Sequence, residues 1–238
     1  MFTQKIILQI RKDLKKNVDV KYREGSINFF KEPIECWGVR NPIVKKLEQK
    51  YWQEIKNWHK KDIFWLCEEL LKSNYNEEAG MAFEFLWRIR QTFVKNDFKI
   101  FVLWLKRYIN NWAKCDDFCT HAFGYVLYNY PEFLVQVKKW TKSKNRWERR
   151  ASAVIMIYPT RKDKKFLVHN FAIAGTLLTD SDDLVQKGYG WMLKVASDNY
   201  LEPVFEFVMK RKAKMSRTAL RYAIEKMPDK LKNKVMAR

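Results

Sequence analysis

Hydrophobic side chains recur along most of the chain at intervals of three and four residues, the period of an α-helix with one buried face. The clearest stretch is 97–110, whose apolar positions keep this spacing throughout: Phe98, Phe101, Val102, Leu105, Tyr108 and Ile109. The same period predicts helices over residues 61–73, 77–93, 116–129, 131–140, 146–158, 164–174, 182–197, 203–212 and 216–226. No strand-like alternation or hairpin signal is found, so the sequence predicts an all-α protein.

Two of the expected helices resemble copies of each other. Residues 121–127 and 187–193 share the order small, aromatic, glycine, aromatic, aliphatic, leucine from their second position on. A glycine inside a helix costs about 1 kcal/mol relative to alanine, so we expect Gly124, Gly188 and Gly190 to permit close approach of helices. Helix pairs recurring at roughly 30–40 residues indicate an α-solenoid of HEAT-like helical repeats. The alternative is an irregular helical bundle.

The chain is strongly basic, with a formal net charge of +20 over 238 residues. Such an excess favours a polyanionic partner, with nucleic acid ahead of an acidic membrane surface; the alternative is a lysine-rich bias without function. We expect a single domain over residues 1–238, curved, with a basic concave face able to hold a duplex.

Other features restrict the class of protein. No apolar run reaches the length of a transmembrane helix, and residues 1–16 are charged and amphipathic, unlike a signal peptide. Four cysteines in a chain of this length do not form a disulfide framework. We therefore expect a cytoplasmic monomer that does not act at a membrane.

Candidate chemistry begins at Trp112 and Asp116, one helical turn apart. On a helix over 116–129 the buried stripe is Phe118, Cys119, Ala122 and Val126. Asp116 then lies on the flank, whereas Asp117 is expected on the solvent side. The alternative is that Asp116 merely caps the helix and complements its dipole.

The expected helix 146–158 has two distinct faces. Its core stripe is Trp147, Ala151, Val154 and Ile155. A second face carries Arg146, Arg149 and Arg150, a surface that a phosphate backbone can approach. The alternative is a solvated helix face without a ligand.

The helix over 182–197 places a further tryptophan at the edge of its buried stripe, which we assign to Val185, Gly188, Met192 and Val195. That tryptophan, Trp191, faces toward Lys187 and Lys194, two cations that we expect to contact DNA, so we expect it at a surface. The alternative is ordinary rim packing.

A metal site is not indicated by the sequence. Cys115, Asp116, Cys119 and His121 lack the paired spacing of a zinc site, and no glycine-rich phosphate loop is present. We expect neither a metal nor a cofactor.

At these residues the chain resembles the AlkD-type DNA glycosylases, a DNA alkylation-repair family built from HEAT-like repeats. The resemblance is carried by Trp-x-x-x-Asp at 112–116, Trp-Glu-Arg-Arg-Ala at 147–151, Gln-Lys-x-x-Gly-Trp at 186–191 and Trp-Gly-Val-Arg-Asn-Pro at 37–42. It implies catalytic roles for Asp116, Trp112 and Trp191. It also implies a phosphate contact by Arg150 or Arg149. A family tyrosine falls at Phe29, which the resemblance implies as a DNA contact; it keeps an aromatic face but lacks the hydroxyl.

The implied activity is hydrolysis of the N-glycosidic bond of cationic N3- or N7-alkylated purines in double-stranded DNA, the first step of base excision repair. The resemblance also implies little dependence on a base pocket. Two other functions remain open: a non-catalytic helical-repeat module that binds nucleic acid, and a protein-interaction scaffold. The first requires Asp116 to be only a cap, and the second requires an exposed apolar groove.

Overall fold

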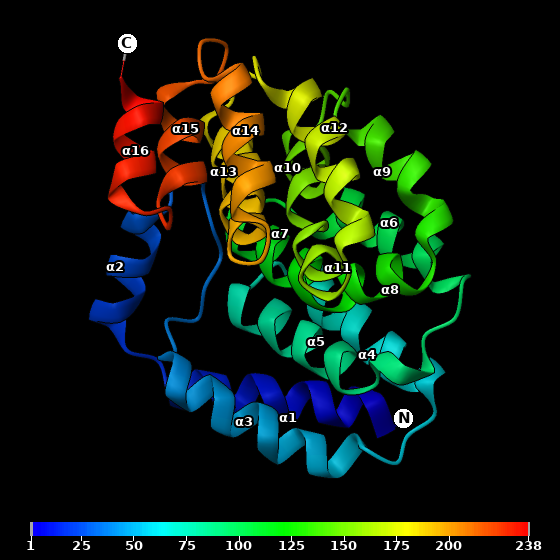
Figure 1. The fold of residues 1–238 in the computed structure, drawn as a ribbon. Coiled ribbons are helices and arrows are strands. Elements are labelled where there is room, and N and C mark those ends of the chain that lie inside the picture. The colour runs from blue at the N-terminus through cyan, green and yellow to red at the C-terminus, as the bar shows by residue number, and fades with distance from the viewer. Residues whose placement is uncertain (1, 238) are drawn as a thin grey trace. The chain divides into compact units, whose positions relative to one another are not determined.

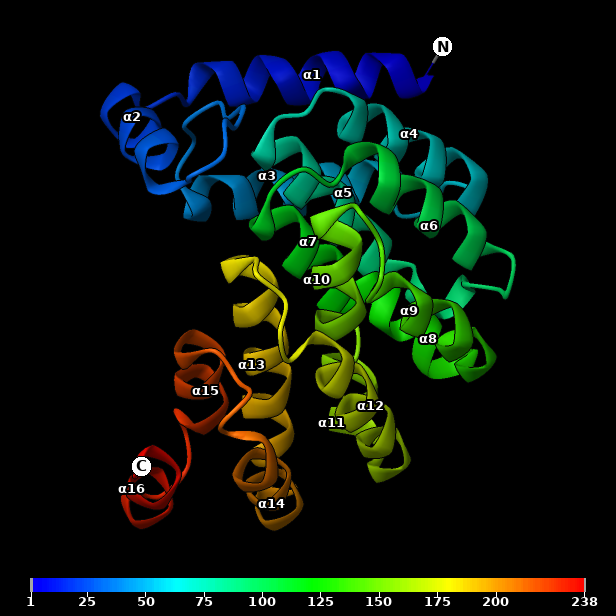
Figure 2. The same cartoon turned by 90° about the horizontal axis from the view of Figure 1, so that it is seen from above.

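The structure is a computed structural model, and it describes residues 2–237 (Figures 1 and 2). Within these residues there is no β-strand, and the only β-type pairing is an isolated bridge between Glu35 and Tyr75. The all-α prediction is confirmed. The chain divides into two compact units, an N-terminal unit (Met1–Asp117) and a C-terminal unit (Phe118–Arg238); a single domain over 1–238 stays a prediction.

The N-terminal unit contains the first helices of the chain: α1 (Phe2–Lys16), α2 (Val20–Phe29), α3 (Asn41–Ile55), α4 (Lys60–Lys72), α5 (Asn76–Arg88), a short 3₁₀ turn (Arg90–Thr92), α6 (Asp97–Tyr108) and the start of α7 (Trp112–Phe118). Helix α1 lies beside α3 and α4, and α5 packs on both α3 and α4 (Figure 2). Contacts thus join α4 to the adjacent α5, and they also join helices two or three apart along the chain, as expected for stacked helix pairs.

The C-terminal unit continues from α7 through a π-helical turn (Cys119–Phe123) and contains the remaining helices: α8 (Gly124–Asn129), α9 (Leu134–Trp140), α10 (Arg146–Val154), α11 (Ile157–Lys162), α12 (Leu167–Leu177), α13 (Asp183–Ser197), α14 (Leu201–Arg211), α15 (Arg217–Ile224) and α16 (Asp229–Met236), with 3₁₀ turns at Pro131–Phe133 and Lys164–Phe166. Helix α13 lies at the centre of this unit, packed against α10, α12, α14 and α15. The stacked-pair pattern is again that of a helical-repeat solenoid. The curved basic face concerns the whole chain and stays a prediction.

The predicted helices are all present, and several differ in extent. The stretches 131–140 and 164–174 each begin with a 3₁₀ turn before α9 and α12. The stretch 77–93 ends as α5 at Arg88, and the helix expected from Asp116 begins earlier, at Trp112. The stretch 146–158 divides into α10 and α11 around Ile155. The break follows from Pro159, which lacks an N–H and whose ring would clash with the carbonyl of Ile155, four residues earlier.

The predicted core stripes of the C-terminal unit are confirmed. All four positions assigned to each of α10 and α13 are buried, as are Phe118, Cys119, Ala122 and Val126. Ser216 caps α15 by accepting a hydrogen bond from the backbone N–H of Ala219 (3.2 Å).

Two of the three predicted glycine contacts are close backbone approaches. A Cβ on Gly124 would lie 2.7 Å from Cβ of Tyr158, and a Cβ on Gly190 would lie 2.7 Å from Cβ of Tyr222. A Cβ on Gly188 would lie 3.2 Å from Cγ of Arg150, so this glycine accommodates a side chain.

Helices α1, α2, α3 and α16 are not among the predicted helices, although the sequence of residues 1–16 is amphipathic. No residue of α2 is buried, so it has no apolar stripe to recognise. Helix α3 does have an apolar stripe, formed by Val44, Leu47, Tyr51 and Ile55, so its helical period is present in the sequence.

Candidate functional site

The start of α7 is fixed by a buried polar network. Asn111 caps the helix, because its Oδ1 accepts from the backbone N–H of Lys114 (3.0 Å), and its Nδ2 donates to Oδ1 of Asn76 (2.9 Å). Nζ of Lys114 donates to the carbonyl oxygen of Asn74 (2.7 Å) and to Oδ1 of both Asn74 (2.6 Å) and Asn110 (3.1 Å). Burial lowers the pKa of the Lys114 ammonium to about 8. These contacts set the position of Trp112, the first residue of the helix.

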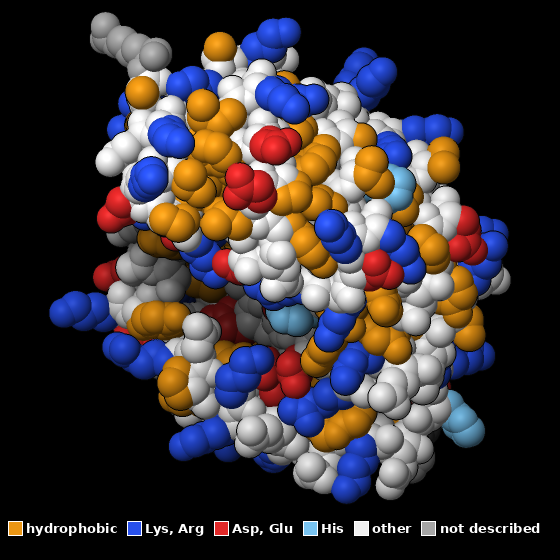
Figure 3. Space-filling model, viewed as in Figure 1, with side chains coloured by type: hydrophobic (Ala, Val, Ile, Leu, Met, Phe, Trp, Pro, Cys, Tyr) orange, Lys and Arg blue, Asp and Glu red, His pale blue; other side chains and the backbone are white. Residues whose placement is uncertain are grey.

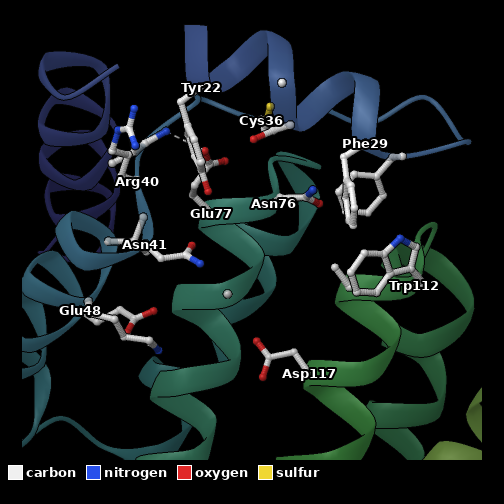
Figure 4. Close-up of a pocket in the computed structure, with 18 of the residues that line it drawn as sticks. Tyr22, Phe29, Cys36, Arg40, Asn41, Glu48, Asn76, Glu77, Trp112 and Asp117 are labelled. Carbon is white, nitrogen blue, oxygen red and sulfur yellow. Dashed lines mark hydrogen bonds and ion pairs between the residues drawn. The ribbon is translucent and has the colours of Figure 1, made fainter. Parts of the chain in front are cut away.

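Trp112 belongs to an aromatic cluster with two residues from the end of α2. Its ring stacks on Phe30, with centroids 5.1 Å apart and an interplanar angle of 16°. Phe29 meets the same indole edge-on at 5.9 Å and is 71% exposed. The structure therefore brings together two of the residues singled out in the sequence, Trp112 and Phe29 (Figure 4).

Asp116 lies one turn after Trp112 and is half-exposed. Helix α7 begins at Trp112, so Asp116 is its fifth residue. The capping position is occupied by Asn111, and Asp116 therefore does not cap this helix. Asp117, expected on the solvent side of the helix, is half-exposed, and its carboxylate lines a cavity of the N-terminal unit (Figure 4).

The cavity has a volume of about 920 Å³ and lies wholly within the N-terminal unit. Helices α2, α3, α5 and α7 contribute its walls (Figure 4). Its aromatic lining consists of Tyr22, Phe29, Phe30 and Trp112. Pockets of about 300–1000 Å³ with an apolar lining and a few polar groups are typical of small-molecule sites.

Charged side chains on α3 form one side of this cavity. Glu48 is 2% exposed, and burial raises the pKa of its carboxyl. Its Oε2 lies 2.8 Å from Nζ of Lys45 but accepts no hydrogen bond of normal geometry. Burial alone would lower the pKa of the Lys45 ammonium, but Glu48 and the neighbouring carboxylates Glu84 and Asp117 raise it. The cation is therefore surrounded by acidic groups.

Another carboxylate of the cavity, Glu77, is held by backbone. It accepts hydrogen bonds from three successive N–H groups, those of Trp37 (3.0 Å), Gly38 (2.7 Å) and Val39 (3.0 Å). Gly38 has a φ of 83°, a left-handed conformation that favours glycine. Part of the 37–42 motif is thereby explained, because its backbone N–H groups attach the loop before α3 to Glu77 at the start of α5.

The three arginines predicted to share an exposed face of α10 are engaged with the segment that leads into α13. Nε of Arg146 lies 2.6 Å from Oδ2 of Asp182, and Nε of Arg149 lies 2.7 Å from Oδ2 of Asp180. Burial opposes ionisation of Asp182, but Arg146 and two backbone N–H groups outweigh it and lower its pKa.

Arg150 is not on an exposed face, and this part of the prediction was wrong. It is 5% exposed, and its Nη1 donates to the carbonyl oxygen of Leu184. The absence of a side chain at Gly188 leaves space for Arg150 between α10 and α13. Its role as a DNA contact stays a prediction.

Trp191 is half-buried on α13, and both neighbouring lysines are paired. Nζ of Lys187 lies 3.3 Å from Oδ2 of Asp183, and Nζ of Lys194 lies 3.0 Å from Oε2 of Glu225. Every cation predicted to contact DNA thus has an intramolecular partner in the C-terminal unit.

The basic excess of the chain is visible on its surface. Lysine and arginine side chains are spread over the face in Figure 3, with fewer acidic side chains among them. Within residues 2–237, no group of three or more His, Cys, Asp or Glu is arranged to hold a metal ion. The helices in this range are too short or too polar to cross a bilayer.

Comparisons with known proteins agree with this fold. A protein from Enterococcus faecalis, described as a predicted DNA alkylation repair enzyme, superposes with a TM-score of 0.76 over 89% of this chain and 97% of its own, at 18% identity. No curated protein sequence matches significantly. The family described as DNA alkylation repair enzyme matches residues 10–227, which include nearly all of both units. The chain therefore belongs to the DNA alkylation repair enzyme family.

Proposed function

We propose that the protein is a DNA glycosylase that hydrolyses the N-glycosidic bond of cationic N3- or N7-alkylated purines in duplex DNA. The observation that carries the proposal is the placement of Asp116 on α7. This carboxylate is half-exposed, stands one turn from Trp112, and is not used to cap its helix. This part-exposed carboxylate therefore stands on a helix whose start is held by a buried network.

The reaction needs little acid catalysis, because an alkylated purine is already a cationic leaving group. The bond between C1′ and N9 breaks, its electron pair neutralises the base, and positive charge develops on the sugar. Water then adds to C1′ and releases a proton, leaving an abasic site and a neutral base. Asp116 stabilises the oxocarbenium-like charge and orients the water, which is electrostatic stabilisation at the reacting centre.

The tryptophans and cations have supporting roles in this proposal. Trp112 and Trp191 offer π faces to a cation, each contributing about 0.5–2 kcal/mol. Phe29 adds an exposed aromatic surface next to Trp112. Phosphates are bound by Arg146, Arg149, Lys187 and Lys194, which exchange their carboxylate partners for DNA. Arg149 is the better candidate for the close phosphate contact, since its side chain is 18% exposed whereas Arg150 is only 5% exposed.

The test is single-turnover release of N7-methylguanine from duplex DNA by wild type and Asp116→Asn at matched folded fraction. Loss of the charge should slow excision by about 10- to 1000-fold without weakening duplex binding. Asp62→Asn is the matched control, because Asp62 is an exposed acidic residue in the first turn of α4 and its loss changes the net charge equally.

The outcomes separate the functions. Wild-type excision with a selective loss in Asp116→Asn supports the glycosylase. Salt-dependent duplex binding without excision by wild type would indicate a non-catalytic binding module. Absence of both would leave the protein-interaction scaffold. Full activity in Asp116→Asn would overturn the assignment of this residue.

A further inference from the structure

Lys114 is a buried, charged residue of α7 that the proposed reaction does not use. It is 3% exposed and lies between Trp112 and Asp116 along the chain. Two features of its position are unfavourable by themselves. An ammonium is costly to bury, and a cation in the first turn of a helix opposes the helix dipole. A neutral side chain would avoid both costs, so the charge at this position needs a reason.

Three oxygen acceptors surround the Nζ atom of Lys114. They are the carbonyl oxygen of Asn74 at 2.7 Å, Oδ1 of Asn74 at 2.6 Å and Oδ1 of Asn110 at 3.1 Å. An ammonium has three N–H donors, whereas a neutral amine has one fewer. The geometry therefore matches the protonated side chain, because one of the three acceptors would lose its donor in the neutral form.

Asn74 has an uncommon backbone conformation. Its φ of 66° lies in the left-handed region, and among residues 2–237 it is the only non-glycine residue with a positive φ. Such a conformation persists where the surrounding structure imposes it. In this conformation both oxygens of Asn74 accept hydrogen bonds from the same ammonium. Lys114 thus joins the turn before α5 to the start of α7.

The ammonium of Lys114 loses its proton more readily than that of an ordinary lysine. Burial lowers its pKa to about 8, and the nearby carboxylate of Glu35 opposes this only in part. Glu35 pairs with Tyr75, the residue that follows Asn74, in the isolated β-bridge. An ordinary lysine has a pKa of about 10.4. Lys114 therefore titrates in a range of pH where ordinary lysine side chains stay charged.

We propose that Lys114 is a positioning residue for Asp116: its ammonium fixes the start of α7 to the turn before α5, and loss of its proton loosens this attachment. The role of Asp116 rests on the proposed function, whereas the attachment rests on the network alone. A displacement of about 1 Å at a reacting group can slow a reaction about 100-fold. Because Lys114 is buried, it acts on excision through Asp116 and not through a contact with DNA.

The test compares Lys114→Met with Lys60→Met at matched folded fraction. Lys60 is the matched control, because its Nζ donates to the carbonyl oxygen of Thr92 (3.0 Å) and to the carboxylate of Asp97, at the start of α6. Single-turnover excision of N7-methylguanine at about pH 7 should be at least about 10-fold slower in Lys114→Met than in wild type. Lys60→Met should excise at the wild-type rate. Both variants should bind undamaged duplex DNA with wild-type affinity.

The pH profile separates positioning from a simple loss of packing. Rates are measured from about pH 7 to about pH 9.5, a range that includes the pKa of Lys114. Titration of the substrate affects all the proteins alike and cancels in the ratio of wild-type to variant rates. For Lys114→Met this ratio should fall from at least about 10 to below about 3 as wild type loses the proton. A ratio that is independent of pH, or equal slowing in Lys60→Met, would overturn the proposal.

A second variant provides the test if Lys114→Met does not fold. Asn110 is exposed, and Asn110→Ala removes one of the three acceptors of the ammonium. The charged form of Lys114 then loses stabilisation relative to the neutral form. The pH at which excision falls to half should therefore be lower in Asn110→Ala than in wild type. The same midpoint in both proteins would contradict the proposal.

Hydrogen exchange tests the attachment independently of excision. After correction for intrinsic exchange rates, the backbone amides of α7 in wild type should lose protection as the pH rises through the pKa of Lys114, whereas those of α6 should not. Unchanged protection of α7 would show that the proton of Lys114 does not fix this helix. If wild type excises nothing, the proposed function fails, and the exchange measurement still decides whether Lys114 holds the start of α7.

Discussion

The contact between α13 and α15 gives the sharpest stability prediction. A Cβ on Gly190 would lie 2.7 Å from Cβ of Tyr222 and 2.8 Å from the carbonyl oxygen of Ala219. The second atom is backbone and cannot rotate away. In Gly190→Ala, the two helices must therefore move apart or distort.

The size of the effect follows from two opposing terms. Alanine stabilises a helix interior by about 1 kcal/mol relative to glycine, whereas forcing extra atoms into a packed contact costs about 1–3 kcal/mol. Two contacts well below normal van der Waals distance place Gly190→Ala in the upper part of that range. We expect its free energy of unfolding to fall by about 1–2 kcal/mol. Gly175→Ala meets no clash, so we expect it to gain about 0.5–1 kcal/mol.

The assay is urea denaturation followed by far-ultraviolet circular dichroism. Wild type, Gly190→Ala and Gly175→Ala are compared with one common slope of the free energy of unfolding against urea concentration. The difference between the two variants, about 1.5–3 kcal/mol, does not depend on the absolute stability of the protein. If Gly190→Ala were as stable as Gly175→Ala, the close approach of α13 and α15 would be refuted. A changed slope would instead show that the unfolded or folded state had altered.

The remaining predictions concern buried and paired charges. Lys114→Met removes an ammonium from three oxygen acceptors and should lower the free energy of unfolding by about 2–4 kcal/mol; no change in urea denaturation would contradict its structural role. The pKa of Asp182 is lowered in the folded state, so its stabilisation is complete above the usual aspartate pKa and is lost as the pH falls through the lowered value. Asp182→Asn should therefore be less stable than wild type at neutral pH, and its free energy of unfolding should decrease less as the pH falls. If it decreased as much as that of wild type, the Asp182 carboxylate would not contribute to the pH dependence of stability. Asp180→Asn releases Arg149 and should tighten binding of undamaged duplex DNA. A plot of log binding constant against log salt concentration should be steeper than the slope of about −4 to −5 expected for five phosphates. If Arg149 does not reach DNA, the variant and wild type should give the same slope.

The hydrophobic period by itself determined most of the helices from α4 onward and their buried sides. The stripes on α10 and α13 were predictable, because a side chain's place on a helix depends only on its position in the sequence. The helical glycines Gly124 and Gly190 were also informative, since their cost in a helix implies a compensating contact.

The tertiary structure decided what each polar face meets. Arg150 and Arg149 are adjacent in sequence, yet one is buried against a carbonyl because Gly188 of another helix leaves room for it. Asp117 faces a cavity whose walls come from four helices separated along the chain. A period of three to four residues reports which side of a helix is apolar, but the partner of a polar side chain depends on a different helix. Only the packing of the helices determines that partner.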